Sequence, residues 1–515
     1  MIEGVNFIGN ATSSEGAETL RAYNPMENKE LAEQFSIATR QEVKQALQKA
    51  QAAFLDYRHL SGERKADFLD QVAEEIMSLG DELVERASAE SGLPTGRIEG
   101  ERGRTCNQLK MFADLLREGS WVDARIDHGE PDVRRMLVPL GPVVVFGASN
   151  FPLAFSTAGG DTASALAAGC SVVVKGHESH PGTNELISGA IIEAAKKTEM
   201  PDGVFSSLNG GPKVGGELVT DPLTKAVGFT GSFKGGKAIF DMVQQRDEPI
   251  PVYAEMGSIN PVFLLDEKLS ASAEELAEEY AGSVSLGVGQ FCTNPGLIVA
   301  KAGSNLDTFK NVLAEKLSNQ SAGCMLNPNI SDNYKQQRAT MFEQPGIEVV
   351  KAPGEEPQTR GAGAVAATTA EHFIANEKLG EEVFGPYTLV VSCSNESEMH
   401  KVAGSLAGQL TVTFMGEDEE LADYRSLISI CREKAGRVIF NGVPTGVRVC
   451  QAMHHGGPFP ATTDSKFTSV GTTAIERFAR PVAFQDCPEA LLPDALKDDN
   501  PLEIYRNVDG KRISK

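Results

Sequence analysis

The chain has 515 residues, of which 41% are hydrophobic and 23% charged, and its formal net charge is −23. This length excludes a single small core, because cores stop growing near about 300 residues. The negative charge opposes binding to nucleic acid or to an anionic membrane, so we expect neither partner. The first 20 residues lack the apolar core of a secretion signal, and no apolar run is long enough to cross a membrane. Eight scattered cysteines without zinc-type spacing indicate reduced thiols, a cytoplasmic location and no metal site.

The predicted elements change in character along the chain. Apolar residues at helical spacing predict helices over 41–57 and 62–89, and we assign the charged residues of 41–120 to solvated helix faces. From about residue 133, short β-branched runs alternate with small-residue helices. The predicted strands are 143–146, 171–175, 226–230 and 252–255, and the predicted helices are 162–169, 183–198 and one from about 231. This alternation predicts parallel βαβ units of a nucleotide-binding sheet.

The second half of the chain shows the same kind of pattern. A further α/β block is predicted from about 257 to 450, and the Pro-, Glu- and Gly-rich stretch 351–363 predicts a surface loop. A short strand is predicted at 480–485 in the tail. The chain is therefore of the α/β class, with a separate C-terminal extension.

Two reactive side chains lie where catalytic groups are often found. Cys292 lies among Gly, Thr, Asn and Pro in 289–295, which indicates a loop where a thiolate can be stabilised. Glu255 ends an apolar strand, and the carboxyl ends of strands are where α/β sheets place ligands. Taken singly, an inert cysteine is the commoner interpretation, and a solvated acid is as good as a catalytic one.

Two further loops have features of ligand-binding loops. Asn150 follows the strand 143–146 and can donate to a developing oxyanion, although an Asx turn is the simpler interpretation. The glycines of 229–236 lie between a strand and a helix, where a pyrophosphate can approach the helix N-terminus. The spacing is not GxGxxG, so a plain turn is an equally good interpretation.

Together with Lys175 at a strand end, these motifs resemble in chain order the aldehyde dehydrogenase superfamily. The resemblance runs from Asn24-Pro25 through 381–386 to 456–457. Four segments also resemble the branch that contains α-ketoglutaric semialdehyde dehydrogenases and a long-chain fatty aldehyde dehydrogenase: 146–155, 159–169, 292–296 and 445–446.

The resemblance implies an aldehyde dehydrogenase fold with three parts. They are a Rossmann-like cofactor domain (1–122 and 142–256), an α/β catalytic domain (257–467) and a small oligomerisation extension (123–141 and 468–515). It also implies a homodimer or homotetramer.

The resemblance further implies NAD(P)-dependent oxidation of an aldehyde to a carboxylic acid through a cysteine thiohemiacetal and thioester. Cys292 would be the nucleophile, Glu255 the base that activates water, and Asn150 an oxyanion donor. The implied cofactor contacts are Lys175, Glu178, Gly231, Ser232, Gly236, Glu382 and Phe384. The implied substrate contacts are Phe151, Arg448 and Phe459.

Cofactor and substrate choice stay open at this point. Glu178 favours NAD, because a carboxylate accepts from the 2′-OH and repels a 2′-phosphate, although Lys175 and His177 can offset that repulsion. α-Ketoglutaric semialdehyde is the expected substrate, and a long-chain or broad-specificity enzyme is the alternative. Arg448 is either a clamp for the substrate carboxylate or an ordinary surface arginine. Acyl transfer to coenzyme A and a non-catalytic role are disfavoured, because Glu255 and Cys292 are both present.

Overall fold

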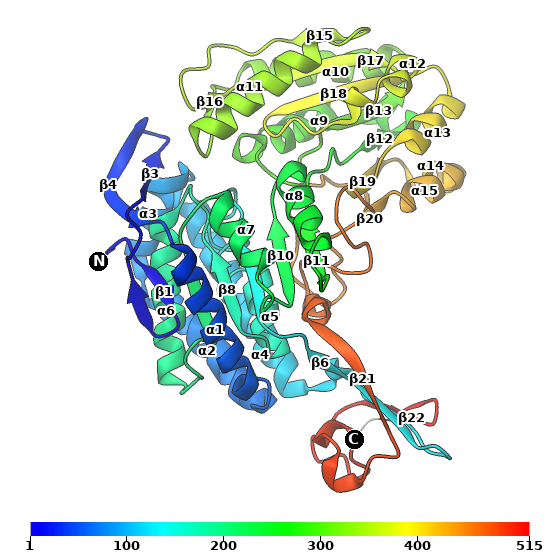
Figure 1. Cartoon of the computed structure of the whole chain (residues 1–515). Helices are drawn as coiled ribbons and strands as arrows, with labels where there is room; N and C mark the ends of the chain where they lie inside the picture. The colour runs from blue at the N-terminus through cyan, green and yellow to red at the C-terminus, as the bar shows by residue number, and fades with distance from the viewer. Residues whose placement is uncertain (1, 514–515) are drawn as a thin grey trace.

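Two seven-stranded sheets organise the chain, each in its own lobe, and a five-stranded sheet extends away from them (Figure 1). The computed structural model describes residues 2–513. None of the helices in this range combines the length and apolar character of a membrane span. The α/β class predicted from the sequence is confirmed.

The sheet of the N-terminal lobe contains the four strands predicted from apolar runs. Across the sheet the order is β11 (Val252–Glu255), β10 (Ala226–Thr230), β7 (Val143–Phe146), β8 (Val172–Lys175), β9 (Phe205–Leu208), β1 (Asn6–Ile8) and β2 (Ala11–Ser13). The five strands from β11 to β9 are parallel. The chain leaves β7 toward β8 and β9 on one side and returns to β10 and β11 on the other. This reversal of strand order between β7 and β10 marks the place where such sheets bind ligands.

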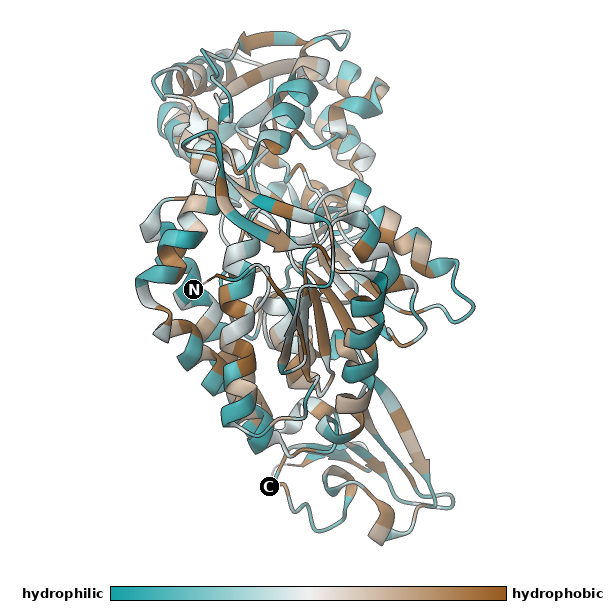
Figure 2. Cartoon of the chain, turned by 60° about the vertical axis from the view of Figure 1, so that its left-hand side comes forward, coloured by the Kyte–Doolittle hydropathy of each residue, from teal (hydrophilic) through white to brown (hydrophobic). Residues whose placement is uncertain are grey.

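Helices cover both faces of this sheet. They are α1 (Arg40–Tyr57), α2 (Gly62–Ser78), α3 (Gly80–Ser91), α4 (Thr95–Glu118), α5 (Gly160–Ala168), α6 (Pro181–Lys197), α7 (Pro212–Thr220) and α8 (Phe233–Gln244). Val143 and Val145 face a core shared with α2, α4, α5 and α6, whereas Val144 and Phe146 face a core shared with α1, α7 and α8. Burial on both faces explains why the strands are unbroken apolar runs, visible as brown arrows in Figure 2.

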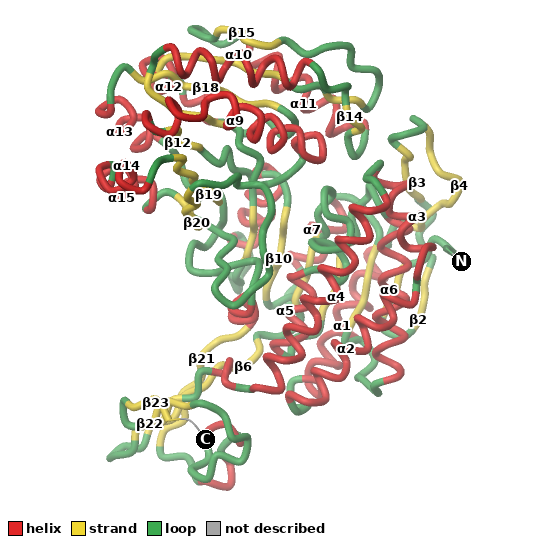
Figure 3. The backbone as a smooth tube through the Cα atoms, turned by 180° about the vertical axis from the view of Figure 1, so that it is seen from behind, coloured by secondary structure: helices red, strands yellow, loops and turns green. Residues whose placement is uncertain are grey.

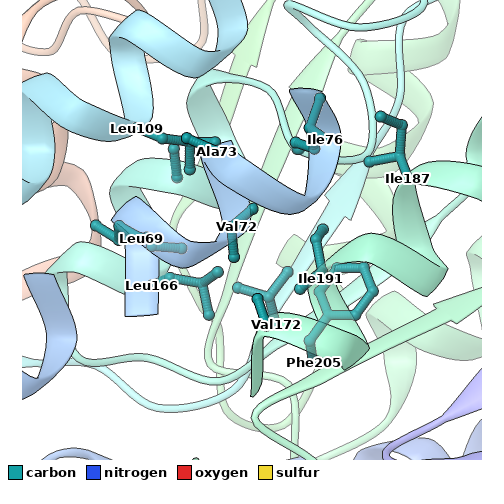
Figure 4. Packing of buried hydrophobic residues seen from close by; sticks show 14 of the residues in the cluster. Leu69, Val72, Ala73, Ile76, Leu109, Leu166, Val172, Ile187, Ile191 and Phe205 are labelled. Carbon is teal, nitrogen blue, oxygen red and sulfur yellow. The ribbon is translucent and has the colours of Figure 1, made fainter. Parts of the chain in front are cut away.

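The first of these cores fixes α2 against the sheet. Figure 4 shows Leu69 and Val72 of α2 packed beside Leu166 of α5 and Val172 of β8. All four side chains are essentially inaccessible to solvent. This packing holds the strand ends that carry the candidate site in fixed positions.

Two local features differ from the prediction. The predicted helix 62–89 is two helices, because Gly80 adopts a left-handed backbone (φ 55°) that an α-helix cannot continue. Strand β9 was not predicted, because Ser206 and Ser207 interrupt its apolar run. Both serines are buried and hydrogen-bonded, Ser206 accepting from Gly9 N at 3.0 Å and Ser207 donating to Asn184 at 3.2 Å.

The assignment of all charges in 41–120 to solvated faces is wrong for three carboxylates. Glu42, Glu90 and Glu101 are buried. Glu90 accepts from the backbone N–H groups of Gly182 and Thr183, both at 2.8 Å, which compensates the loss of hydration.

The second lobe is also a sheet covered by helices. Its strand order is β15 (Glu348–Lys351), β17 (Ala364–Thr369), β18 (Tyr387–Cys393), β13 (Leu297–Lys301), β12 (Val262–Leu264), β19 (Gln409–Met415) and β20 (Ala435–Phe440). Its helices are α9 (Asp266–Ser285), α10 (Ser304–Ser318), α11 (Pro328–Phe342), α12 (Ala370–Ala375), α13 (Glu396–Ser405), α14 (Asp418–Asp423) and α15 (Arg425–Arg432). The predicted loop 351–363 is irregular except at β15 and at β16 (Arg360–Gly361), which pairs with β14 (Gly323–Cys324).

The extension joins two distant parts of the chain. Its sheet has the order β21 (Ala479–Gln485), β6 (Val133–Pro139), β5 (Arg125–Asp127), β22 (Arg506–Val508) and β23 (Lys511–Ile513). Figure 3 shows β6 and β21 running together from the N-terminal lobe into this sheet. A separate hairpin, β3 (Thr19–Asn24) with β4 (Lys29–Ser36), lies near the N-terminus.

Candidate active site

Cys292 lies on the loop that enters β13, and the backbone of this loop is tightly held. Gly289 has φ 65°, and a Cβ there would lie 2.3 Å from the backbone of Gly385, so the turn before the cysteine requires glycine. Asn260 donates to the carbonyls of Cys292 at 2.8 Å and Asn294 at 2.9 Å. The segment that follows β11 therefore fixes the position of the nucleophile.

Three side chains from distant segments converge at this cysteine. His455 Nε2 lies 3.6 Å from Cys292 Sγ and 3.0 Å from Glu255 Oε1. Ser469 donates to the other carboxylate oxygen of Glu255 at 2.6 Å. Glu255, His455 and Ser469 are buried, whereas Cys292 is partly exposed. The site thus joins a reachable thiol to an enclosed carboxylate and imidazole.

The segment 455–470 reaches Glu255 because it pairs with the edge of the N-terminal sheet. Met256 N donates to Ala461 O at 2.8 Å, and Thr463 N donates to Ala254 O at 3.1 Å. His455 and Ser469 are joined by a backbone hydrogen bond of 2.9 Å. The family resemblance implies that His455 belongs to a segment, 454–459, that lines the substrate mouth, but it predicts no contact of His455 or Ser469 with Glu255.

The protonation states at rest follow from these contacts. Burial and then the charge of Glu255 raise the pKa of the Cys292 thiol well above its ordinary value. Burial opposes ionisation of Glu255, but His455 and the hydrogen bonds from His455, Ser469 and Cys292 hold the pKa of this carboxyl below its usual range. The resting pair is therefore a neutral thiol beside an ionised carboxylate, and the thiol must lose its proton before it attacks.

The donor atoms of Glu255, Cys292 and His455 all lie within 4.8 Å of one another. Sulfur, imidazole nitrogen and carboxylate oxygen are ligands that Zn²⁺ accepts. The absence of a metal site therefore stays a prediction.

The predicted oxyanion donor lies against the cysteine loop. Asn150 Nδ2 donates to Gln290 O at 3.0 Å, two residues before Cys292. The next residue, Phe151, packs edge to face against Phe155 and Phe291, with ring centroids 5.2 and 5.5 Å apart. The structure thus brings Asn150 and Phe151 to the same loop as the nucleophile.

The turn after β10 has the form expected of a pyrophosphate cradle. Gly231 N donates to Glu255 O at 3.0 Å, and Ser232 caps α8 by accepting from Gly235 N at 3.2 Å. A Cβ at Gly231 would lie 2.7 Å from the Phe229 ring, and one at Gly236 would lie 2.7 Å from Met256. The N-terminus of α8 favours an anion, so the residues present fit a bound dinucleotide.

Lys175 and Glu178 lie beyond the end of β8. Lys175 is buried, which lowers the pKa of its ammonium group, and the charge of Glu178 opposes this effect. Glu178 is exposed, and its carboxylate lies close to Gly211, where a Cβ would be 2.9 Å away. Both side chains are therefore on the side of the sheet where the strands end.

Glu382 and Phe384 come from the second lobe. They line a cavity together with Ser258 and Phe291. A Cβ at Gly257 would lie 2.2 Å from a carboxylate oxygen of Glu382, so a side chain at position 257 would displace this carboxylate. Burial raises the pKa of Glu382 to about 7, although a backbone hydrogen bond from Ser258 opposes the shift. The negative charge of Glu382 raises the pKa of the Cys292 thiol, so Glu382 lies in the same site.

The two remaining predicted substrate residues lie further out. Phe459 is 56% exposed and packs against Phe233 at the start of α8, with ring centroids 5.9 Å apart. Arg448 is exposed, and within residues 2–513 it has no hydrogen bond or ion pair. Its position favours the interpretation as a surface arginine.

Comparisons with known proteins agree with this geometry. The sequence profile of the aldehyde dehydrogenase family matches residues 11–466. The chain is 49% identical to alpha-ketoglutaric semialdehyde dehydrogenase 2 of Azospirillum brasilense, over 99% of each chain. It is 44% identical to the alpha-ketoglutaric semialdehyde dehydrogenase of Acinetobacter baylyi, over 98% of each chain.

The fold has solved counterparts. A mutant of aldehyde dehydrogenase C from Pseudomonas syringae, in complex with NAD+ and octanal, superposes with a TM-score of 0.81 at 21% identity, over 94% of this chain and 96% of that one. The chain belongs to the aldehyde dehydrogenase family and has its fold. It is an NAD(P)-dependent oxidoreductase, as the resemblance implied.

Proposed function

We propose that the protein oxidises α-ketoglutaric semialdehyde to the corresponding dicarboxylic acid, with Cys292 as the covalent nucleophile. The observation that carries the chemistry is the contact of Cys292 Sγ with His455, which in turn contacts the buried carboxylate of Glu255. The substrate is supported by the two relatives named for this aldehyde, which align over nearly the whole chain.

The thiol is activated by its buried neighbours. The proton on Cys292 Sγ passes to Glu255, with which the thiol is hydrogen-bonded, and it leaves Glu255 for solvent before hydrolysis begins. His455 Nε2 contacts both groups and donates to the carboxylate. The thiolate then forms a bond to the aldehyde carbon, and the carbonyl oxygen becomes an oxyanion. Asn150 Nδ2 and the backbone N–H of Cys292 stabilise this charge. A bound nicotinamide would supply the hydride acceptor for the former aldehyde carbon, which would leave a thioester on Cys292.

Hydrolysis of the thioester needs a base, and Glu255 is ionised at rest. Its carboxylate takes a proton from water, the resulting hydroxide attacks the thioester carbon, the carbon–sulfur bond breaks, and Glu255 returns the proton to the Cys292 thiolate. The hydrogen bond from Ser469 holds one carboxylate oxygen, so the other oxygen is oriented toward His455 and the thiol. The products are the carboxylic acid and a restored Cys292.

The cofactor is held by residues of both lobes in this proposal. Lys175 and Glu178 would contact the adenosine ribose. The turn of Gly231, Ser232 and Gly236 at the N-terminus of α8 would hold the pyrophosphate. Glu382 would bind the nicotinamide ribose, with Phe384 beside it. Because the exposed carboxylate of Glu178 repels a 2′-phosphate, we propose a preference for NAD over NADP.

The domain and assembly assignments belong to the same proposal. Residues 1–122 with 142–256 form the cofactor domain, 257–467 the catalytic domain, and 123–141 with 468–515 the oligomerisation segments. The oligomerisation segments 123–141 and 468–515 share the five-stranded sheet. The edge strand of this sheet, β23, is exposed along its length. An exposed edge strand can pair with another chain, so we propose a homodimer or homotetramer in the cytoplasm.

The test is an oxidation assay with α-ketoglutaric semialdehyde, followed by the absorbance of the reduced cofactor and by detection of the acid product. We expect a higher kcat/KM for this aldehyde than for pentanal or dodecanal. A preference for dodecanal would overturn the substrate assignment and support a long-chain aldehyde dehydrogenase. The rings of Phe151, Phe155 and Phe291 form an apolar cluster that suits a long alkyl chain. No reduced cofactor with any aldehyde would overturn the reaction itself.

A further inference from the structure

Arg104 is a partly enclosed cation without a partner. It lies on α4, and its Nε atom and one terminal nitrogen are inaccessible to solvent and have no hydrogen-bond partner. Within residues 2–513 it makes no hydrogen bond and no ion pair, although a guanidinium has five N–H donors. Buried donors without acceptors are costly, so a structure that keeps them indicates a ligand that supplies the acceptors.

Arg104 lies close to the nucleophile, next to the ring of Phe155. Its guanidinium lies 5.2 Å from the centroid of the Phe155 ring, and that ring lies 6.3 Å from the ring of His455. His455 itself contacts Cys292. The charge of Arg104 also counteracts the rise in the pKa of the Cys292 thiol, which requires the two groups to be close.

The other arginines near the site are already engaged. Arg97 lies between the rings of Phe151 and Phe291, at 4.5 and 4.8 Å from their centroids, and forms an ion pair with Glu101 at 3.5 Å. Arg437 donates to the carbonyls of Pro444 and Gly446 at 2.9 and 3.1 Å, and so holds the loop that carries Arg448. Arg437 Nε also lacks an acceptor, but of these three arginines Arg104 is the one that makes no hydrogen bond or ion pair within residues 2–513.

The carboxylates near Arg104 are engaged by other groups. Glu101 is buried, and one of its oxygens accepts from the backbone N–H groups of Leu153 and Ala154, both at 2.9 Å. Burial lowers the pKa of the Arg104 guanidinium, although the charges of Glu101 and Glu255 oppose this shift. Glu101 forms its ion pair with Arg97, and Glu255 is held by His455 and Ser469, so neither carboxylate supplies an acceptor to Arg104.

We propose that Arg104 binds the carboxylate of the aldehyde substrate and determines the preference for an anionic semialdehyde. The inference rests on the proposed function and identifies the residue that recognises this substrate class. A guanidinium donates two parallel hydrogen bonds to a carboxylate, which fixes the orientation of the ligand as well as its charge. The rings of Phe151, Phe155 and Phe291 enclose the carbon chain between Arg104 and Cys292, and their low polarity strengthens the ion pair.

The experiment compares kcat/KM for α-ketoglutaric semialdehyde and for pentanal in the wild type, Arg104→Met and Arg104→Lys. The ratio of the two constants is the readout, because loss of Arg104 also changes the thiol, and both aldehydes use the same thiol. Arg104→Met should lower the ratio by about 10- to 100-fold, the range of a charged hydrogen bond. Arg104→Lys should retain part of the wild-type ratio. The matched control is Arg102→Met on the same helix, where the arginine donates to Gly80 O at 2.7 Å outside the site.

A second measurement tests the proposal if Arg104→Met does not fold. Glutarate should inhibit pentanal oxidation by the wild type more strongly than pentanoate does, and Arg104→Lys should weaken this difference while keeping a folded enzyme. If the wild type prefers the semialdehyde and neither the ratio nor the inhibition changes in the Arg104 variants, the carboxylate is bound elsewhere and the proposal fails. If the wild type shows no preference for the semialdehyde, the proposed function itself fails.

Discussion

The two sides of Cys292 are built differently. On one side, both oxygens of Glu255 accept hydrogen bonds, one from Ser469 at 2.6 Å and the other from His455 at 3.0 Å. On the other side, Arg104 lies 5.2 Å from the centroid of the Phe155 ring, and its buried Nε and one terminal nitrogen have no acceptor. A hydrogen-bonded carboxylate and imidazole are suited to moving protons, whereas an unpaired cation among apolar rings is suited to selecting a ligand. We therefore expect changes on the first side to lower turnover with every aldehyde, and changes on the second to alter selectivity.

The largest effect on turnover is expected from removing the sulfur of Cys292, which lies between the two sides. Cys292→Ala removes the covalent step, so turnover should fall by about 10⁴-fold or more with charged and neutral aldehydes alike. Cofactor binding and the thermal unfolding midpoint should stay close to wild type. Cys487→Ala, a partly exposed cysteine of the extension, is the matched control. Turnover within about tenfold of wild type would show that another group forms the adduct.

Glu255→Gln should separate the two chemical steps. The amide cannot take a proton from water, so thioester hydrolysis should slow by about 10²- to 10⁴-fold. Acylation also loses its proton acceptor but should slow less than hydrolysis, so rapid mixing should show a burst of reduced cofactor followed by a slow steady state. Normal steady turnover without a burst would mean that another base activates the water.

The same variant tests the charge state of the thiol. Burial and the carboxylate of Glu255 raise the pKa of Cys292, so removing the negative charge should lower that pKa and increase the thiolate fraction at a given pH. The rate of alkylation of Cys292 by iodoacetamide should accordingly rise at lower pH in Glu255→Gln than in the wild type. Each unit of the pKa shift is about tenfold in thiolate at neutral pH. An unchanged pH profile would contradict the coupling of the two groups.

Sequence patterns predicted one side of Cys292 better than the other. Glu255 and Lys175 end apolar strands, and the carboxyl end of a parallel strand has a predictable place in the fold. His455 and Ser469 reach Glu255 only because their segment pairs with β11, a contact between residues about 200 positions apart. Such a contact leaves no local periodicity in the sequence.

Sequence patterns did not identify Arg104 as a site residue for a related reason. Arg104 lies on a helix with many charged residues, a composition typical of solvated faces. What distinguishes it is the approach of Phe155, from a loop that Glu101 anchors through Leu153 and Ala154. The strand β9 was missed because its buried serines are satisfied by partners far along the chain. Burial of polar residues depends on tertiary partners, which composition alone does not reveal.

A smaller effect is expected at the cofactor. Glu178→Gln removes the charge that opposes a 2′-phosphate, so the ratio of kcat/KM with NADP to that with NAD should rise by about tenfold, equivalent to about 1.4 kcal/mol. Glu217→Gln on α7, away from the strand ends, is a control for the change in net charge. A wild-type enzyme with a higher kcat/KM for NADP would contradict the assigned role of Glu178.

The smallest effect should come from Arg448, and it separates the two candidates for the carboxylate clamp. Arg448 is exposed on its loop, so its attraction to a substrate anion is screened by water and salt, whereas Arg104 acts among apolar rings. Arg448→Ala should therefore change the ratio of kcat/KM for α-ketoglutaric semialdehyde and pentanal by less than about threefold, the range of an exposed ion pair. That change should disappear when the ionic strength is raised, because only a screened, long-range interaction is lost. If Arg448→Ala instead lowers the ratio as strongly as Arg104→Met at both ionic strengths, the loop must close over the bound substrate, and Arg448 rather than Arg104 holds the carboxylate.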